Sequence, residues 1–188
     1  MSTRLKLLAI LFFLSAAAAG AQSPSDGHLE GRTYVNTFFH IAYAWPSILQ
    51  PEQRSGINLP NPSPRHVEFY LFAARQGSDQ FGVLMIAEKL RSLTADPKDF
   101  RDAADLLSRI KRGFDPAANW KPLAEGHLTN ADGLVIDEFD YVIAGEYSSA
   151  IVVTLDGYLV VARCNARSAA DLKAMTDSLV AMRRTPKR

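Results

Sequence analysis

Hydrophobic and polar positions alternate along several stretches of this 188-residue chain. At the first stretch, 38–45, a period of two places aromatic and branched residues on one side, which predicts a strand with an aromatic inner face. Similar patterns predict strands at 66–74, 81–87, 134–143, 147–155 and 158–165. The last two flank Asp156-Gly157, a dipeptide typical of a tight hairpin turn. This hairpin is the clearest element of the chain.

Two helices are predicted by apolar residues that recur near a period of 3.6. The first stripe runs from Phe100 to Phe114, with Asp96 as the expected N-cap and Pro97 at the first helical position. The second helix opens at Ser168, where Asp171 completes an approximate capping box. Because hairpin-connected strands alternate with only two helices, we predict an α+β fold, a mainly antiparallel twisted sheet of about six strands flanked by helices.

The start of the chain has the three parts of a bacterial secretory signal peptide. Arg4 and Lys6 supply positive charge, the segment 7–14 is strongly apolar, and residues 19–21 have small side chains. The apolar stretch is shorter than the roughly 20 residues of a membrane-spanning helix, which favours a cleaved signal peptide over a membrane anchor. We expect residues 1–21 to be removed by cleavage before Gln22. The product is then periplasmic or secreted: a flexible terminus at 22–31, one domain at 32–183 and a solvated basic tail at 184–188.

Charge and cysteine content narrow the possible partners. Cleavage removes two basic residues, so the 21 Lys plus Arg of the chain fall to 19 against 20 Asp plus Glu. No basic cluster precedes the tail, so we expect no nucleic acid partner. Cys164 is the one cysteine, far from the expected cleavage site, which excludes an internal disulfide and an acyl anchor at the mature terminus. It shares strand parity with apolar residues, and we expect an inert, buried thiol.

The sequence contains no motif that specifies a reaction or a cofactor. His40, His66 and His127 lack a second ligand at the short spacings of metal sites, so we predict no metal. Ser148 and Ser149 stand outside any Gly-x-Ser-x-Gly pattern, which favours a structural role over a catalytic one. Glycine-rich phosphate loops do not occur. We therefore predict no catalytic residues and no cofactor.

Three acids at 137–140 leave two interpretations open. Glu138 and Asp140 share one face of a strand, where mutual repulsion raises a pKa, as in paired-carboxylate chemistry. The simpler interpretation is a solvated outer face opposite Phe139, although it leaves Asp137 on the inner side unexplained. We take the simpler one as the expectation.

A proline-rich stretch at 46–64 holds five of the ten prolines and is expected to form an irregular loop. Long loops of this kind often contact partners, so we single out Arg54, Ile57, Leu59 and the following His66 as a possible contact surface. Trp45 and Trp120, by contrast, are expected in the core rather than in a ligand pocket.

Several segments taken in order resemble the PsbP-like fold family. The chain from Tyr34 to Pro46 is similar to the opening of that family, and 157–161 followed by 168–172 is similar to its closing hairpin and helix. Family openings usually have glycine where His40 stands, and again near 47–49. The resemblance implies a layered α-β-α fold. It also implies a binding role, because the family shares no catalytic set.

We therefore expect an exported, non-enzymatic binding or accessory domain that acts on a protein or envelope partner. One alternative is a secreted hydrolase that uses the scattered histidines with an acid. It requires two histidines within about 8 Å of each other or of one of the acids at 137–140, a spacing that allows at most one bridging group. A second alternative is a structural subunit of an envelope assembly.

Overall fold

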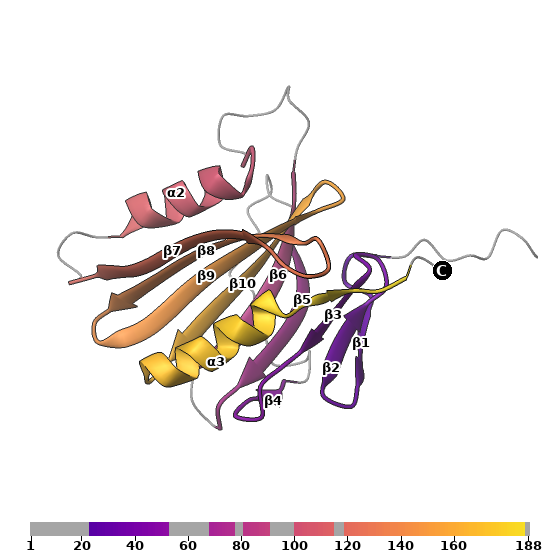
Figure 1. The fold of residues 1–188 in the computed structure, drawn as a ribbon, viewed down its shortest axis with the longest axis horizontal. Helices are drawn as coiled ribbons and strands as arrows, with labels where there is room; N and C mark the ends of the chain where they lie inside the picture. The colour runs from indigo at the N-terminus through magenta and orange to yellow at the C-terminus, as the bar shows by residue number, and fades with distance from the viewer. Residues whose placement is uncertain (1–22, 53–67, 78–80, 91–99, 115–118, 187–188) are drawn as a thin grey trace, which may run out of the picture.

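The computed structural model describes residues 23–52, 68–77, 81–90, 100–114 and 119–186. Its centre is a seven-stranded sheet in which every neighbouring pair is antiparallel (Figure 1). In spatial order the strands are β4 (Gln50–Pro51), β5 (Glu68–Arg75), β6 (Gly82–Lys89), β10 (Tyr158–Ala166), β9 (Glu146–Leu155), β8 (Val135–Ile143) and β7 (Lys121–Thr129). The predominance of antiparallel strands agrees with the predicted α+β class, but the sheet is larger than the six strands expected.

A second, four-stranded sheet stands beside the first and joins the two ends of the described chain. In order, its strands are β1 (Gly27–Glu30), β2 (Thr33–Asn36), β3 (Ile41–Ala44) and β11 (Arg183–Arg184). The inner face of β3 is as predicted, since Ile41 and Tyr43 are fully buried. The flexible start expected at 22–31 is instead partly a strand, and the basic tail begins with residues that pair with β3.

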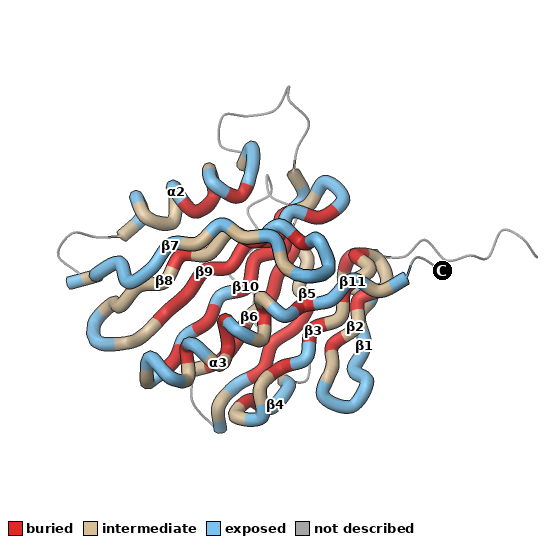
Figure 2. Tube along the Cα trace, in the orientation of Figure 1, coloured by how far each residue is buried: buried red, intermediate tan, exposed pale blue. Residues whose placement is uncertain are grey.

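The two helices pack on opposite faces of the large sheet. Helix α2 (Ala103–Gly113) joins a cluster that includes Val152, whereas α3 (Ala169–Val180) joins one that includes Val153. Successive residues of a strand point to opposite faces, so β9 is buried on both sides. Figure 2 shows buried residues along the central strands, which lie between the two helices. Of the described residues, none belongs to a helix long and apolar enough to span a membrane.

The tight turn between β9 and β10 is confirmed. Leu155 pairs with Tyr158, and the two residues between them have positive φ, 46° at Asp156 and 82° at Gly157. Mirror-image turns need this geometry and match the twist of the strands. Ala144 and Gly145 make a similar turn between β8 and β9, although alanine at φ 51° is strained.

His40 occupies a backbone position suited to glycine. Its φ is 52°, in the left-handed region that residues with a side chain adopt at a cost. The PsbP-like pattern has glycine here, so the departure noted in the sequence lies at a strained turn. The amide of Thr185 donates to the carbonyl of His40 at 2.8 Å, which ties the end of the described chain to this turn.

The helix starts are partly as expected. The hydroxyl of Ser168 accepts a hydrogen bond from the amide of Asp171 at 3.1 Å, so the predicted cap of α3 is confirmed. The N-cap of α2 is Asp102 rather than Asp96, because its carboxylate accepts from the amide of Asp105 at 2.8 Å. Asp96 and Pro97 lie outside the described residues.

The large sheet also contains two strands, β4 and β7, that were not expected from the sequence. No element was predicted where strand β7 lies, and Pro122 is tolerated because β7 is at the sheet edge. In the loop predicted at 46–64, Leu49 is buried and Gln50–Pro51 pairs with β5. Glu52 then forms an ion pair with Arg75, which fixes the start of this loop against the sheet.

Candidate functional site

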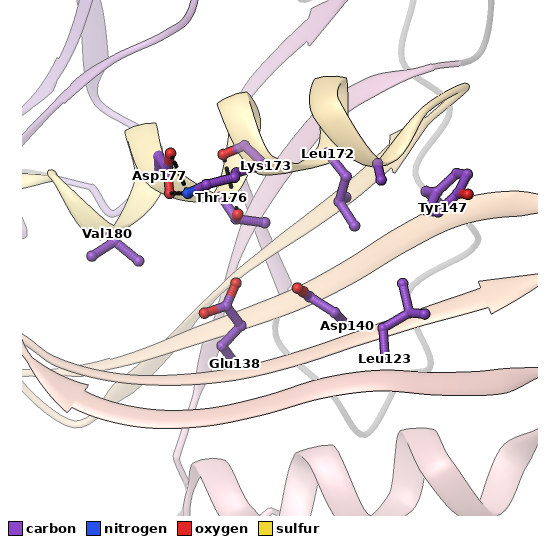
Figure 3. A pocket seen from close by; sticks show the side chains of 10 residues that line it. Leu123, Glu138, Asp140, Tyr147, Leu172, Lys173, Thr176, Asp177 and Val180 are labelled. Carbon is purple, nitrogen blue, oxygen red and sulfur yellow. Dashed lines mark hydrogen bonds and ion pairs between the residues drawn. The ribbon is translucent and has the colours of Figure 1, made fainter.

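A groove of about 310 Å³ opens between helix α3 and strands β7 to β9 (Figure 3). Glu138 and Asp140 extend from β8 at its floor, with their carboxyls pointing toward the helix. Lys173 and Asp177 form the helical wall. We call this hollow the α3 groove, and define it by Leu123, Glu138, Asp140, Tyr147, Lys173 and Asp177.

The two acids of the groove, Glu138 and Asp140, have raised pKa values. They stand two residues apart and so share one face of the strand. Burial is the main cause of the rise for each carboxyl. The negative charges of Asp140 and Asp177 raise the pKa of Glu138 further, against a smaller opposing effect of Lys173. The two carboxyls also interact with each other, which raises the pKa of Glu138 further.

The expectation of a solvated outer face is wrong for these acids. Glu138 and Asp140 are half-buried beneath α3. Both carboxyls have raised pKa values, as the alternative interpretation of a same-face pair expected. Phe139 is fully buried on the opposite face, in the cluster with α2. The sequence marked the pair correctly but gave no sign that a helix would lie over it.

Unsatisfied polar atoms lie beside the pair. Ser149 on β9 is directly across from Asp140 and is 1% exposed. Asp140 Oδ1 and Ser149 Oγ are both buried without a hydrogen bond of good geometry, although the nearby hydroxyl still lowers the pKa of Asp140. Buried polar atoms are almost always paired, so these two atoms are an exception in the core of the sheet.

The basic residue of the groove is already engaged. Lys173 Nζ lies 2.7 Å from the carboxylate of Asp177, one turn along the helix. In the described part of the chain, neither Glu138 nor Asp140 forms an ion pair with any basic side chain. The groove therefore has three acids and one base, and the base contacts the acid on its own helix.

One end of the groove is fixed by Asn130, which follows β7. Its amide donates to the carbonyls of Val180 and Met182 at 2.9 and 2.8 Å. Its side-chain oxygen accepts from the amides of Asp132 and Leu134, each at 3.0 Å. The side chain thus satisfies the carboxyl end of α3 and holds the helix at a set height above β8.

Of the three candidate histidines, His40 and His127 are described, and they do not converge on one site. His127 Nδ1 lies 2.8 Å from Asp137 on the α2 side of the sheet, so one histidine, of the two that the hydrolase alternative requires, is within the stated distance of an acid. The ring is 71% exposed, however, and His40 lines a separate hollow on the small sheet. Among the described residues no three His, Cys, Asp or Glu side chains group as a metal site requires.

Other residues named from the sequence fall as follows. Cys164 is fully buried and burial raises its pKa, in agreement with an inert thiol. Trp45 stacks on Phe72 in the core, with ring centroids 5.3 Å apart. Ser148 donates to the side chain of Asn165 at 3.0 Å. The proposed contact residues, together with the predicted signal peptide, lie outside the described residues: Arg54, Ile57, Leu59 and His66.

Comparison with known proteins identifies the fold. The solution structure of cyanobacterial PsbP (CyanoP) from Synechocystis sp. PCC 6803 is similar to this chain with a TM-score of 0.55 at 14% identity. The likeness covers 89% of this chain and 97% of that one, so a PsbP-like fold is confirmed. No family model and no curated protein matches. At this identity the likeness concerns the fold alone.

Proposed function

We propose that this chain is an exported, non-enzymatic binding domain for a protein of the cell envelope, and that the α3 groove holds a basic side chain of that partner. The observation that supports the site is the carboxyl pair on β8. Two half-buried acids with raised pKa values, and no ion pair in the described part of the chain, are stabilised by an added cation.

The lining of the groove suits a long basic side chain. Leu123 and Tyr147 offer apolar surface at one end, against which the methylene stem of lysine or arginine can lie. The charged head then meets the two carboxylates of Glu138 and Asp140. Charge-assisted hydrogen bonds of this type are about twice as strong as neutral ones.

The proposal is tested with a minimal ligand. N-acetyl-lysine methylamide presents one ammonium group, and the norleucine analogue has nearly the same shape without charge. We expect the lysine compound alone to shift the side-chain carboxyl resonances of Glu138 and Asp140 and to lower their pKa values. Binding weakens on acidification, because protonation of the two carboxyls removes the negative charge that attracts the ligand.

Matched variants separate this site from general charge. Glu138→Gln with Asp140→Asn removes these two carboxyls, so binding is followed in all variants by the shift of the ligand's own ε-methylene resonance, which the double variant should abolish. Glu125→Gln removes an acid on the opposite face, where it pairs with Lys111, and should leave this shift intact. Equal binding of the lysine and norleucine compounds, or retention of binding by the double variant, contradicts the site.

The contact between His127 and Asp137 favours a second candidate, a hydrolase. An aspartate at Nδ1 orients the ring so that Nε2 can act as a base. Ser108 lines the same hollow on the α2 side, without a hydrogen bond to the ring in the described structure. Ester hydrolysis lost in His127→Ala and kept in His40→Ala would support this candidate, whereas equal rates would eliminate it.

A further inference from the structure

Strand β7 is an open edge of the large sheet. It is nine residues long, and among the described residues no strand pairs with its outer side. An exposed edge offers unpaired backbone groups to any extended chain. Pro122 and the register shift between Pro122 and Ala124 protect the first part of the strand. The remainder, 124–129, has no such protection.

Small residues of β7 leave the carboxyls open to this edge. Ala124 pairs with Asp140, and Gly126 pairs with Glu138, so both small residues stand on the same face as the acids. A Cβ atom on Gly126 would lie 3.5 Å from Glu138 Oε2, which means that this carboxylate leans over the glycine. Glu138 is therefore reached across β7 over Gly126, whereas Asp140 is reached over Ala124 with Leu123 beside it.

The spacing of this arrangement matches a strand. Neighbouring strands lie about 4.8 Å apart, so a strand added beyond β7 lies about 10 Å from β8. Lysine and arginine are the side chains long enough to cross that distance and also charged to suit the acids. Since alternate residues of a strand share a face, two basic residues at positions i and i+2 would face Glu138 and Asp140 together.

We infer that β7 accepts an extended segment of the partner protein as an eighth strand, with basic residues at i and i+2 that reach the two carboxyls over Ala124 and Gly126. This inference rests on the proposed function and adds the conformation and sequence pattern of the ligand. Asp140, which lines the groove, also has a buried Oδ1 without a hydrogen bond of good geometry.

The test compares two peptides of equal composition with the full chain. One alternates valine with lysine, so that two lysines stand at i and i+2. In the other the lysines are adjacent and project to opposite faces of a strand. We expect the alternating peptide to bind about tenfold more tightly, since it forms a second charge-assisted hydrogen bond. Methylation of alternate backbone amides on its pairing edge should abolish the difference.

A variant places the ligand on β7. Gly126→Val fills the gap in front of Glu138 without removing either acid, and should weaken the alternating peptide while leaving N-acetyl-lysine methylamide bound. His127→Val is the control on the other face. Equal affinity of the two peptides overturns the inference, even if the lysine compound binds. Self-association through β7 that the alternating peptide does not displace also overturns it. Failure of the lysine compound itself would count against the proposed function instead.

Discussion

Glu88 gives the sharpest test of the electrostatics of this fold. It lies on β6 directly across from Glu68 on β5, and it is only 9% exposed. Burial and then the charge of Glu68 raise the pKa of Glu88 to about 7, against a smaller opposing effect of Arg163. Substitution by glutamine keeps the shape of the side chain and removes the charge.

The size of the effect follows from the pKa. A carboxyl that binds its proton more tightly in the folded state stabilises that state when protonated, and this contribution is lost as the pH rises through the folded pKa. Each pKa unit corresponds to about 1.4 kcal/mol. A rise from 4.5 to about 7 therefore corresponds to about 3 kcal/mol of unfolding free energy, present below pH 4.5 and lost by the time the pH exceeds 7.

Urea unfolding of the unaltered protein and Glu88→Gln, followed from pH 4.5 to 8, measures this contribution. Near pH 4.5 the two proteins should be equally stable, and at pH 8 the variant should be more stable by about 3 kcal/mol. The raised pKa values of Glu138 and Asp140 make both proteins less stable as the pH rises, so the difference between the two curves isolates Glu88.

A graded variant tests the assigned cause. Glu68→Gln retains Glu88 but removes the nearby charge, so the decline in stability should move toward lower pH and become smaller. Parallel curves for Glu88→Gln and the unaltered protein would refute the reasoning, because they would mean that Glu88 ionises alike in the folded and unfolded chain.

Three further outcomes are expected. Asn130→Asp should destabilise the protein by about 2 kcal/mol at pH 7 in urea unfolding, because a carboxylate cannot donate to the two carbonyls at the end of α3, and no loss would mean that these hydrogen bonds contribute little. Ala144→Gly should stabilise by about 0.5 kcal/mol, since relief of the left-handed strain exceeds the added entropy of the unfolded chain, whereas a decrease would contradict the turn geometry. Cys164 should resist a thiol-reactive disulfide reagent until the protein is unfolded in urea, and fast labelling of the native protein would show that the thiol is accessible.

Local patterns in the sequence were sufficient for much of the central fold. The β9–β10 hairpin and the Ser168 cap depend on residues close in sequence, and both are as predicted. Strand β7 could not be recognised in this way, because a strand at a sheet edge needs neither strong alternation nor high β-propensity. Its pairing with β8 depends on tertiary context that the sequence pattern does not contain.

The candidate site was half visible from the sequence. Strand parity placed Glu138 and Asp140 on one face, and repulsion between them was anticipated. Their environment depends on α3, which begins about 30 residues later and is held above them by Asn130. Contacts across such separations follow from topology rather than from local periodicity. The sequence therefore identified the acids and the helix separately, and missed that the helix lies over the acids and half-buries them.

The pairing of Arg183 and Arg184 with β3 has a consequence for the order of folding. A polypeptide emerges amino end first from a ribosome or a translocation channel, so β3 waits for a partner strand about 140 residues away in the chain. The small sheet can be completed only when nearly the whole described chain is free. Proteins that depend on such distant pairings fold slowly. Until that step, the edge of β3 is exposed to other chains, and a holding chaperone would find its target there.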